Sequence, residues 1–132
     1  MTIEPRFLTI SEVIEIHDQE IEAAGGLSGV RDLKALESAI GAPQASFNGQ
    51  FLMDIFEMAA TYLNSIAINH PFLDGNKRTA LASSLTFLFM NGYEIDESYD
   101  EELADKTLQL VTREITKSDL TKHLKSRSKE IK

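Results

Sequence analysis

The chain has 132 residues, a formal net charge of −8 and no cysteine. Its length suits one compact domain, which we expect to span residues 1–132, and a composition of 42% hydrophobic and 26% charged residues is typical of a globular protein. The missing cysteines exclude disulfide bonds and thiolate metal sites, and the negative charge argues against a general nucleic-acid binder.

Targeting signals are not evident in the sequence. No apolar stretch approaches the roughly 20 residues needed to cross a bilayer, and residues 1–10 lack the features of a signal peptide, so we expect a cytoplasmic protein. Residues 117–132 carry six Lys and Arg residues against two acidic ones. This pattern favours a solvated helix with cations near its C-terminal end, and the alternative is a basic arm that binds nucleic acid.

The first half of the chain shows two amphipathic helices. Thr9 and Glu12 have the spacing of a capping box, which predicts a helix from Ile10 that ends at Gly25-Gly26. His17 lies on or beside the apolar stripe of this helix, where a hydrogen-bonded core histidine is more common than a ligand. Asp32 can cap a second helix that stops before Pro43. Residues 43–50 follow as a connecting loop or a small hairpin.

The middle of the chain contains the most apolar segment. From about Phe51 the pattern predicts a helix that is apolar around much of its circumference, so we expect it to be the central helix, with His70 at its end. Asn76 is a good N-cap for the next helix, which runs to about Met90.

The sequence of the last third of the chain predicts two further helices. After a stop at Asn91-Gly92, residues 93–95 are expected to be extended, and Ser98 and Glu101 have the spacing of a second capping box. Ser118 is expected to cap a final helix. The sum is an all-α fold, a compact bundle of about six helices with short loops.

The loop between the two middle helices concentrates reactive groups. His70 suits a general base near neutral pH, and Asp74 is a hard oxygen ligand suited to Mg²⁺ carried by a nucleotide. Gly75 allows the backbone to turn tightly and approach an anion. These residues predict a base and a metal-binding carboxylate beside an anion site.

Two cations open the second of these helices. Lys77 and Arg78 have the wrong sign for the positive end of the helix dipole, unless an anion binds there. They could neutralise the charge of a transferred phosphoryl group, which together with His70 and Asp74 completes the minimum set for phosphoryl-type transfer to a hydroxyl. The alternative is a structural loop in which Asp74 and Asn76 cap the helix and the two cations lie in solvent.

The loop also carries a family resemblance. Residues 70–81, His-Pro-Phe-Leu-Asp-Gly-Asn-Lys-Arg-Thr-Ala-Leu, resemble the Fic/Doc superfamily signature, and the ending Asn-Lys-Arg-Thr-Ala-Leu is similar to the Doc (death-on-curing) branch. Further blocks resemble the Doc family in the same order along the chain: 16–18, 25–32, 36–39, 43–45 and 56–60.

The resemblance implies a compact helical fold and a transfer reaction that uses ATP. Most Fic enzymes transfer AMP to a hydroxyl of a target protein. By resemblance, His70 would deprotonate the hydroxyl and Asp74 would hold Mg²⁺ on the phosphates. Asn76, the backbone at Gly75, and Arg78 would contact phosphate.

Two positions depart from the AMP-transferring pattern. Lys77 stands where that pattern has a glycine, and Leu81 where it has a second arginine that holds the terminal phosphates. In the Doc branch the nucleotide lies reversed and the enzyme is a kinase that phosphorylates a threonine of elongation factor Tu, which halts protein synthesis. We therefore predict a kinase-type toxin; an AMP transferase and a non-catalytic binding module are the alternatives.

Regulation is expected to come from a second protein. The superfamily's inhibitory motif, [Ser/Thr]-x-x-x-Glu-[Gly/Asn], has no match here, because the candidate glutamates Glu15 and Glu102 precede Ile16 and Leu103. The resemblance implies a Phd-like antitoxin whose disordered tail folds on the toxin. The loop 43–50 is a candidate for positioning the target, as the corresponding flap does in the superfamily.

Overall fold

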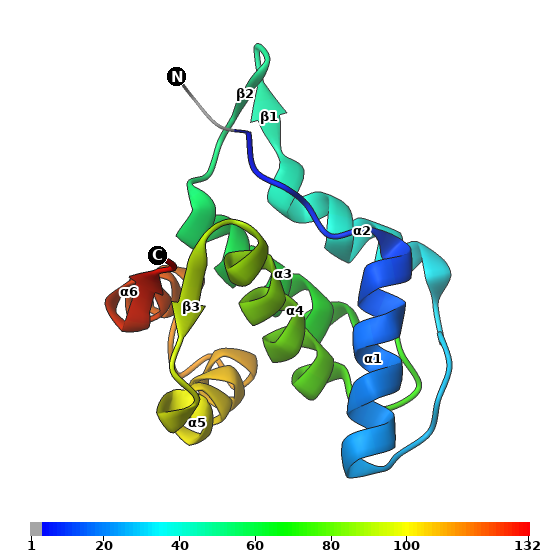
Figure 1. Cartoon of the computed structure of the whole chain (residues 1–132). Helices are drawn as coiled ribbons and strands as arrows, with labels where there is room; N and C mark the ends of the chain where they lie inside the picture. Colours follow the sequence, from blue (N-terminus) through cyan, green and yellow to red (C-terminus); the bar gives the residue numbers. More distant parts are fainter. Residues whose placement is uncertain (1–3) are drawn as a thin grey trace.

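The computed structural model describes residues 4–132, and most of this span is helical (Figure 1). The all-α prediction is confirmed. The six α-helices of this span are, in chain order, α1 (Ile10–Ala24), α2 (Leu33–Gly41), α3 (Ile55–Asn69), α4 (Asn76–Met90), α5 (Asp100–Val111) and α6 (Lys117–Arg127). The short elements are the 3-10 helices η1 (Ala42–Gln44) and η2 (Glu97–Tyr99) and the strands β1 (Ser46–Phe47), β2 (Gln50–Phe51), β3 (Tyr93–Ile95) and β4 (Ser128–Glu130).

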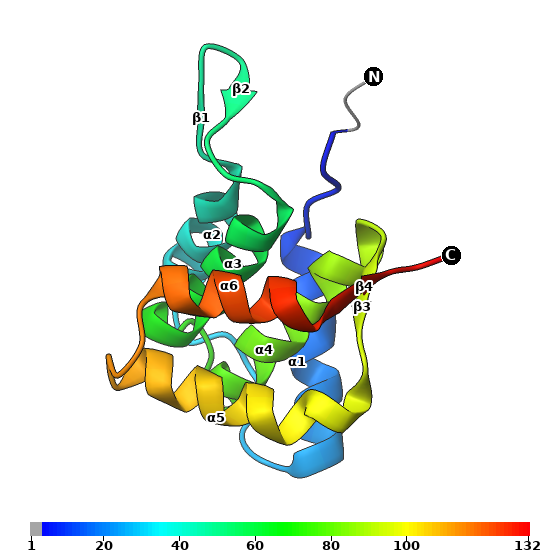
Figure 2. The same ribbon diagram turned by 90° about the vertical axis from the view of Figure 1, so that its left-hand side faces the viewer.

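Helix α3 is the centre of the bundle, as its sequence predicted. It packs on α4 along its length, and it also contacts α2, α5 and α6 (Figures 1 and 2). Its buried residues lie on several sides of the helix: Met58, Ala59, Ala60, Thr61, Tyr62, Leu63, Ile66 and Ala67. Helix α1 covers α4 from the other side. The two ends of α3 and α4 that meet at residues 70–75 are therefore held by a rigid core.

Helices α5 and α6 form the remaining side of the bundle. The Arg127 guanidinium donates two hydrogen bonds of 2.9 Å to the Glu102 carboxylate, and this pair holds the pKa of Glu102 below its ordinary value. The expected cations near the end of the last helix are Lys125 and Arg127. Strand β3, predicted as extended, pairs antiparallel with β4, which the sequence did not predict.

The first two helix starts are confirmed. Thr9 accepts a hydrogen bond from the Glu12 N–H at 3.1 Å while Glu12 accepts one from the Thr9 N–H at 2.9 Å. Asp32 caps α2 by accepting from the Ala35 N–H.

Later helix starts correct the sequence expectations. Helix α3 begins at Ile55 and not near Phe51, because Asp54 and Glu57 form a capping box while Phe51 belongs to a hairpin. Ser98 caps no helix, since it lies in η2, whose start Asp96 caps. Helix α6 is capped by Thr116 rather than Ser118.

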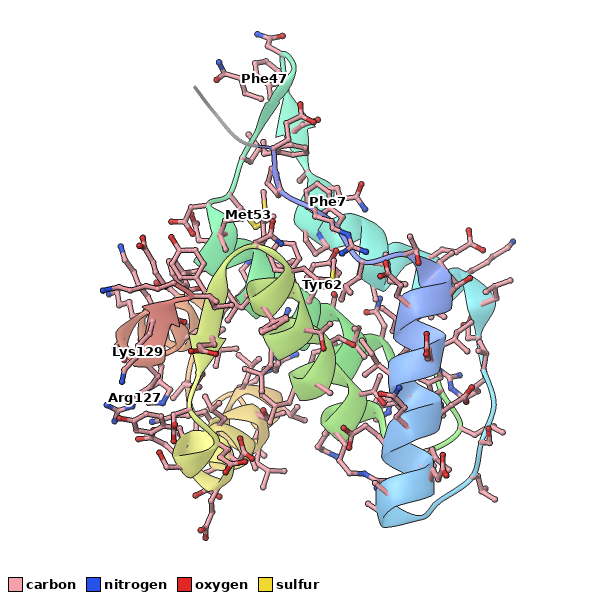
Figure 3. The ribbon with its side chains drawn as sticks, viewed as in Figure 1. Phe7, Phe47, Met53, Tyr62, Arg127 and Lys129 are labelled. Atoms are coloured by element: carbon pink, nitrogen blue, oxygen red, sulfur yellow. The ribbon has the colours of Figure 1, made fainter. Side chains whose placement is uncertain are left out.

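Residues 43–51 contain the hairpin that the sequence left as one of two options. Strands β1 and β2 pair antiparallel and project from the bundle, with Phe47 at the far end (Figure 3). None of the helices within residues 4–132 is long and apolar enough to span a bilayer.

Candidate active site

His70 ends the central helix in a left-handed conformation. Its φ and ψ are 49° and 55°, and it is the C-cap of α3. Only glycine adopts this region without strain, so a histidine here costs about 1–2 kcal/mol that the surroundings must offset. The turn reverses the chain and places an exposed imidazole beside the loop that leads into α4.

Asn76 organises the loop from within. Its buried side chain accepts a hydrogen bond from the Phe72 N–H at 2.9 Å and donates one to the Phe72 C=O at 3.0 Å. These two bonds fix the amide, and its Nδ2 lies 3.3 Å from Nδ1 of His70. As a hydrogen bond, this contact needs the neutral tautomer that has a lone pair on Nδ1 and its proton on Nε2. A neutral ring is the form that a general base needs.

The predicted N-cap role of Asn76 is wrong. Asn76 is the first residue of α4, and Gly75, with a φ of 73°, occupies the N-cap position without any side-chain cap. Within residues 4–132, the N–H groups of Asn76, Lys77 and Arg78 donate to no protein acceptor. Uncapped N–H groups at a helix start form an anion site.

Asp74 is held at three atoms. Its backbone C=O accepts a hydrogen bond from Nε2 of His17 at 2.8 Å, and its carboxylate accepts from the N–H groups of Gly75 and Leu27 at 2.9 and 3.3 Å. The exposed carboxylate retains lone pairs that could bind a cation. Because residues 4–132 contain no group of three metal-ligating side chains, Mg²⁺ would need phosphate or water oxygens as its other ligands.

Lys77 and Arg78 differ in how freely they can move. Lys77 is exposed, whereas the half-buried Arg78 donates to the C=O groups of Gly25 at 2.9 Å and Glu20 at 3.4 Å. Arg78 therefore satisfies carbonyls at the end of α1 and also brings a positive charge to the anion site. The structural-loop alternative, in which both cations lie in solvent, therefore holds for the exposed Lys77 and not for Arg78.

The predicted residues surround one cavity of about 400 Å³. Its lining consists of His70, Leu73, Asp74, Gly75, Asn76, Lys77 and Arg78. A neighbouring apolar pocket of about 260 Å³ lies between α4 and α5, and its lining consists of Lys77, Arg78, Leu81, Ala104, Thr107 and Leu108. Because the two pockets share Lys77 and Arg78, one elongated ligand with an anionic part and an apolar part could occupy both.

Two residues that support the loop were not predicted as site residues. His17 is a hydrogen-bonded core histidine, as expected, but it also stacks on Phe72 with 3.9 Å between the ring centroids and holds Asp74. Arg31 donates to the C=O groups of His70 and Asn69. Both lie in blocks that carry the Doc resemblance, which was the available signal, but the hydrogen-bond partners of these residues are 38 or more residues away.

Comparisons with known proteins find a matching family model and similar proteins. The model of the Fic/DOC family matches residues 7–88. The "Protein kinase doc" of Escherichia phage P1 is 42% identical over 120 residues, which cover 91% of this chain and 94% of that protein. The "Toxin Doc" of Mycolicibacterium smegmatis is 38% identical over 94 residues, which cover 70% of this chain and 72% of that protein.

Proposed function

The chain belongs to the Fic/DOC family, and from this we propose that it is the toxin of a toxin–antitoxin pair that transfers the terminal phosphate of ATP to a hydroxyl of a translation factor. The observation that carries the proposal is the shared cavity. His70, Asp74 and the uncapped start of α4 line it together, so an imidazole, a carboxylate and uncapped backbone N–H groups face the same space. We assign them the roles of base, Mg²⁺ ligand and phosphate site. These are the parts that phosphoryl transfer requires.

Each residue has a separate task in this reaction. His70 would take the proton of the attacking hydroxyl at Nδ1. The hydroxyl must first displace the Asn76 amide from that nitrogen, because the tautomer that accepts the amide carries its own proton on Nε2. The first N–H groups of α4, with Lys77 and Arg78, would bind the phosphate oxygens. Asp74 would hold Mg²⁺, which neutralises the negative charge on the phosphates.

The apolar pocket beside the anion site supports kinase chemistry over AMP transfer. A nucleoside that lies against Leu81 would carry its phosphates past Lys77 and Arg78 into the cavity lined by His70. The terminal phosphate would then face the base. The arginine expected at position 81 in AMP transferases would bind the terminal phosphates at that end instead, which would leave the α-phosphate nearer the hydroxyl.

The decisive experiment determines which phosphate of ATP is transferred to the target protein. The protein is incubated with elongation factor Tu and ATP labelled at either the γ or the α phosphate. We expect label only from the γ position, a mass gain of one phosphate on the target, and a rate about 10²–10⁴ lower for His70→Ala.

The two alternative functions, an AMP transferase and a non-catalytic binding module, predict different results in this experiment. Transfer of the α label would show an AMP transferase, which the intact His-Pro-Phe-x-Asp-Gly-Asn core of residues 70–76 also permits. No label from either position, together with growth arrest that His70→Ala does not relieve, would leave a non-catalytic binding module. Both results contradict the kinase proposal.

The proposed partners follow from the same assignment. A toxin that acts on translation works in the cytoplasm and needs an antitoxin, for which we propose a Phd-like protein with a tail that folds on this chain. The net charge of −8 favours a basic tail, because opposite charges accelerate association. Direct binding to nucleic acid is not part of the proposal.

A further inference from the structure

The left-handed turn at His70 needs support from outside α3. A helix that ends in this conformation usually has glycine there, and its last carbonyl groups need hydrogen-bond donors. The last turn of α3 has no basic residue of its own. The conformation that orients the imidazole is thus both strained and short of local donors.

Arg31 supplies those donors from a distant segment. Its Nε donates to the His70 C=O at 2.8 Å, and its Nη2 donates to the Asn69 C=O at 3.2 Å. A guanidinium can make both bonds at once because its N–H groups lie in one plane, and its charge suits the negative end of a helix dipole. One side chain thereby binds the residue before the turn and the residue in it.

The backbone around Arg31 is fixed on the same loop. The N–H groups of Arg31 and Asp32 both donate to the Pro71 C=O, at 2.8 and 3.1 Å. Leu73 donates to the Gly29 C=O at 3.1 Å, and Val30 and Phe72 form an antiparallel bridge. The Arg31 side chain therefore extends from a backbone that is attached to residues 71–73, next to the two carbonyl groups it binds.

We propose that Arg31 is a positioning residue for His70. Its two hydrogen bonds maintain the left-handed turn, and the turn sets the distance between the imidazole and the phosphate that α4 binds. Arg31 lines neither pocket, so its contribution to the transfer reaction proposed above is indirect.

Steady-state kinetics test this role with three variants. Arg31→Ala removes both bonds, Arg31→Lys keeps the charge without the planar fork, and Lys34→Ala removes an exposed cation three residues away as a control. We expect kcat to fall about 10- to 100-fold in Arg31→Ala with the KM for ATP within about twofold, because the base is displaced while the phosphate site is intact. Arg31→Lys should recover part of the loss, and Lys34→Ala should match the unmodified chain.

Chemical rescue with guanidinium ion distinguishes a loss of His70 positioning from damage to the fold in Arg31→Ala. Arg31 is exposed, so guanidinium ion at millimolar concentration can reach the vacated site and should restore part of the kcat of Arg31→Ala. Equal loss in Arg31→Ala and Lys34→Ala, a parallel rise in KM, or no response to guanidinium would overturn the proposal.

A second measurement does not depend on the reaction. The Asn76 side-chain amide lies 3.3 Å from the His70 ring, so its NMR resonances report the position of the imidazole. We expect them to shift in Arg31→Ala and to stay unchanged in Lys34→Ala; resonances unmoved in both would contradict the role of Arg31. If the unmodified chain transfers no phosphate, the proposed function fails, while this measurement still decides the positioning role.

Discussion

Two adjacent glycines at the end of α1 have different surroundings. Both have a positive φ, 83° at Gly25 and 118° at Gly26. A Cβ atom at Gly26 would lie 2.7 Å from Oδ2 of Asp74, whereas one at Gly25 would have no atom within 4 Å. The absence of a side chain at Gly26 is therefore what allows the Asp74 carboxylate to occupy its position.

This contrast gives a matched pair of substitutions. Gly25→Ala and Gly26→Ala should both cost about 1–2 kcal/mol of stability, because each forces alanine into a strained conformation. Only Gly26→Ala should displace the carboxylate, raising the Mg²⁺ concentration needed for half-maximal activity about tenfold or more. Titrating the transfer rate with Mg²⁺ checks this, and equal Mg²⁺ requirements in the two variants would contradict it.

Single residues also show which parts of the site could be predicted from the sequence. The placement of His70 and Asp74 at one cavity was predictable, because their side-chain chemistry and short spacing in the chain single them out; their roles stay a prediction. The supports His17 and Arg31 were not, because they act through contacts with residues 57 and 39 positions away. Hydrogen bonds over such separations follow from the tertiary fold and leave no periodic pattern.

Among the helices, α3 contains a buried tyrosine. Tyr62 is fully buried and accepts a hydrogen bond from the Leu8 N–H at 3.0 Å. Burial disfavours the phenolate and raises the pKa of Tyr62 from its ordinary value of 10.0 to about 12. The folded state thus keeps this group neutral in a range where the unfolded chain ionises it.

An alkaline loss of stability follows. Below pH 10 the group is neutral in both states, so it adds no pH dependence; between pH 10 and about 12 only the unfolded chain ionises. The contribution of Tyr62 to the free energy of unfolding should therefore fall by about 1.4 kcal/mol per pH unit in that window. Urea unfolding of the unmodified chain and of Tyr62→Phe at pH 8 to 11 measures it. The free energies of unfolding of the two proteins, plotted against pH, should converge above pH 10. A difference between them that stays constant with pH would contradict the raised pKa of Tyr62.

Capping signals predicted the helix boundaries only in part. Near Thr9, Ser11 is a second potential cap, but Glu12 completes the capping box of Thr9 and the helix starts as expected. Near Ser118, Thr116 takes the cap position because Asp119 can complete its capping box, and near Ser98 the side chain of Asp96 caps first. Several residues in each region could serve as caps, and packing of the adjacent helix selects one.

On the scale of the whole molecule, the hairpin stands apart from the bundle (Figures 2 and 3). Phe47 near its tip is 70% exposed, so the core loses little if it is replaced. Phe51, by contrast, contacts Phe7 with 5.2 Å between the ring centroids. An exposed aromatic residue on a projecting hairpin suits contact with a protein substrate.

Replacement of Phe47 should separate target recognition from chemistry. Phe47→Ser is expected to raise the KM for the protein target about tenfold while the Kd of ATP and the free energy of unfolding, within about 0.5 kcal/mol, stay unchanged. The control is Phe89→Ser on α4, which is 60% exposed and lies outside the hairpin and the cavity. If Phe47→Ser and Phe89→Ser have the same KM for the protein target, the hairpin does not contribute to target binding.

The overall architecture was predictable because residues that are buried in a helical bundle recur in the sequence with the helical period. The segment that became α3 is apolar on several sides, which only a central helix can satisfy. Strand β4 could not be predicted from the polar residues 128–130, because it forms only by pairing with β3.

The position of α6 has a consequence for biosynthesis. Leu120 and Leu124 are fully buried, and their helix closes the side of α3 that faces away from α1. A nascent chain that has not yet released residues 117–127 from the ribosome lacks this part of its core. That part packs on α3, which ends at His70, the general base of the proposed reaction. An enzyme directed against translation would then gain its activity only after the ribosome that makes it has passed that point.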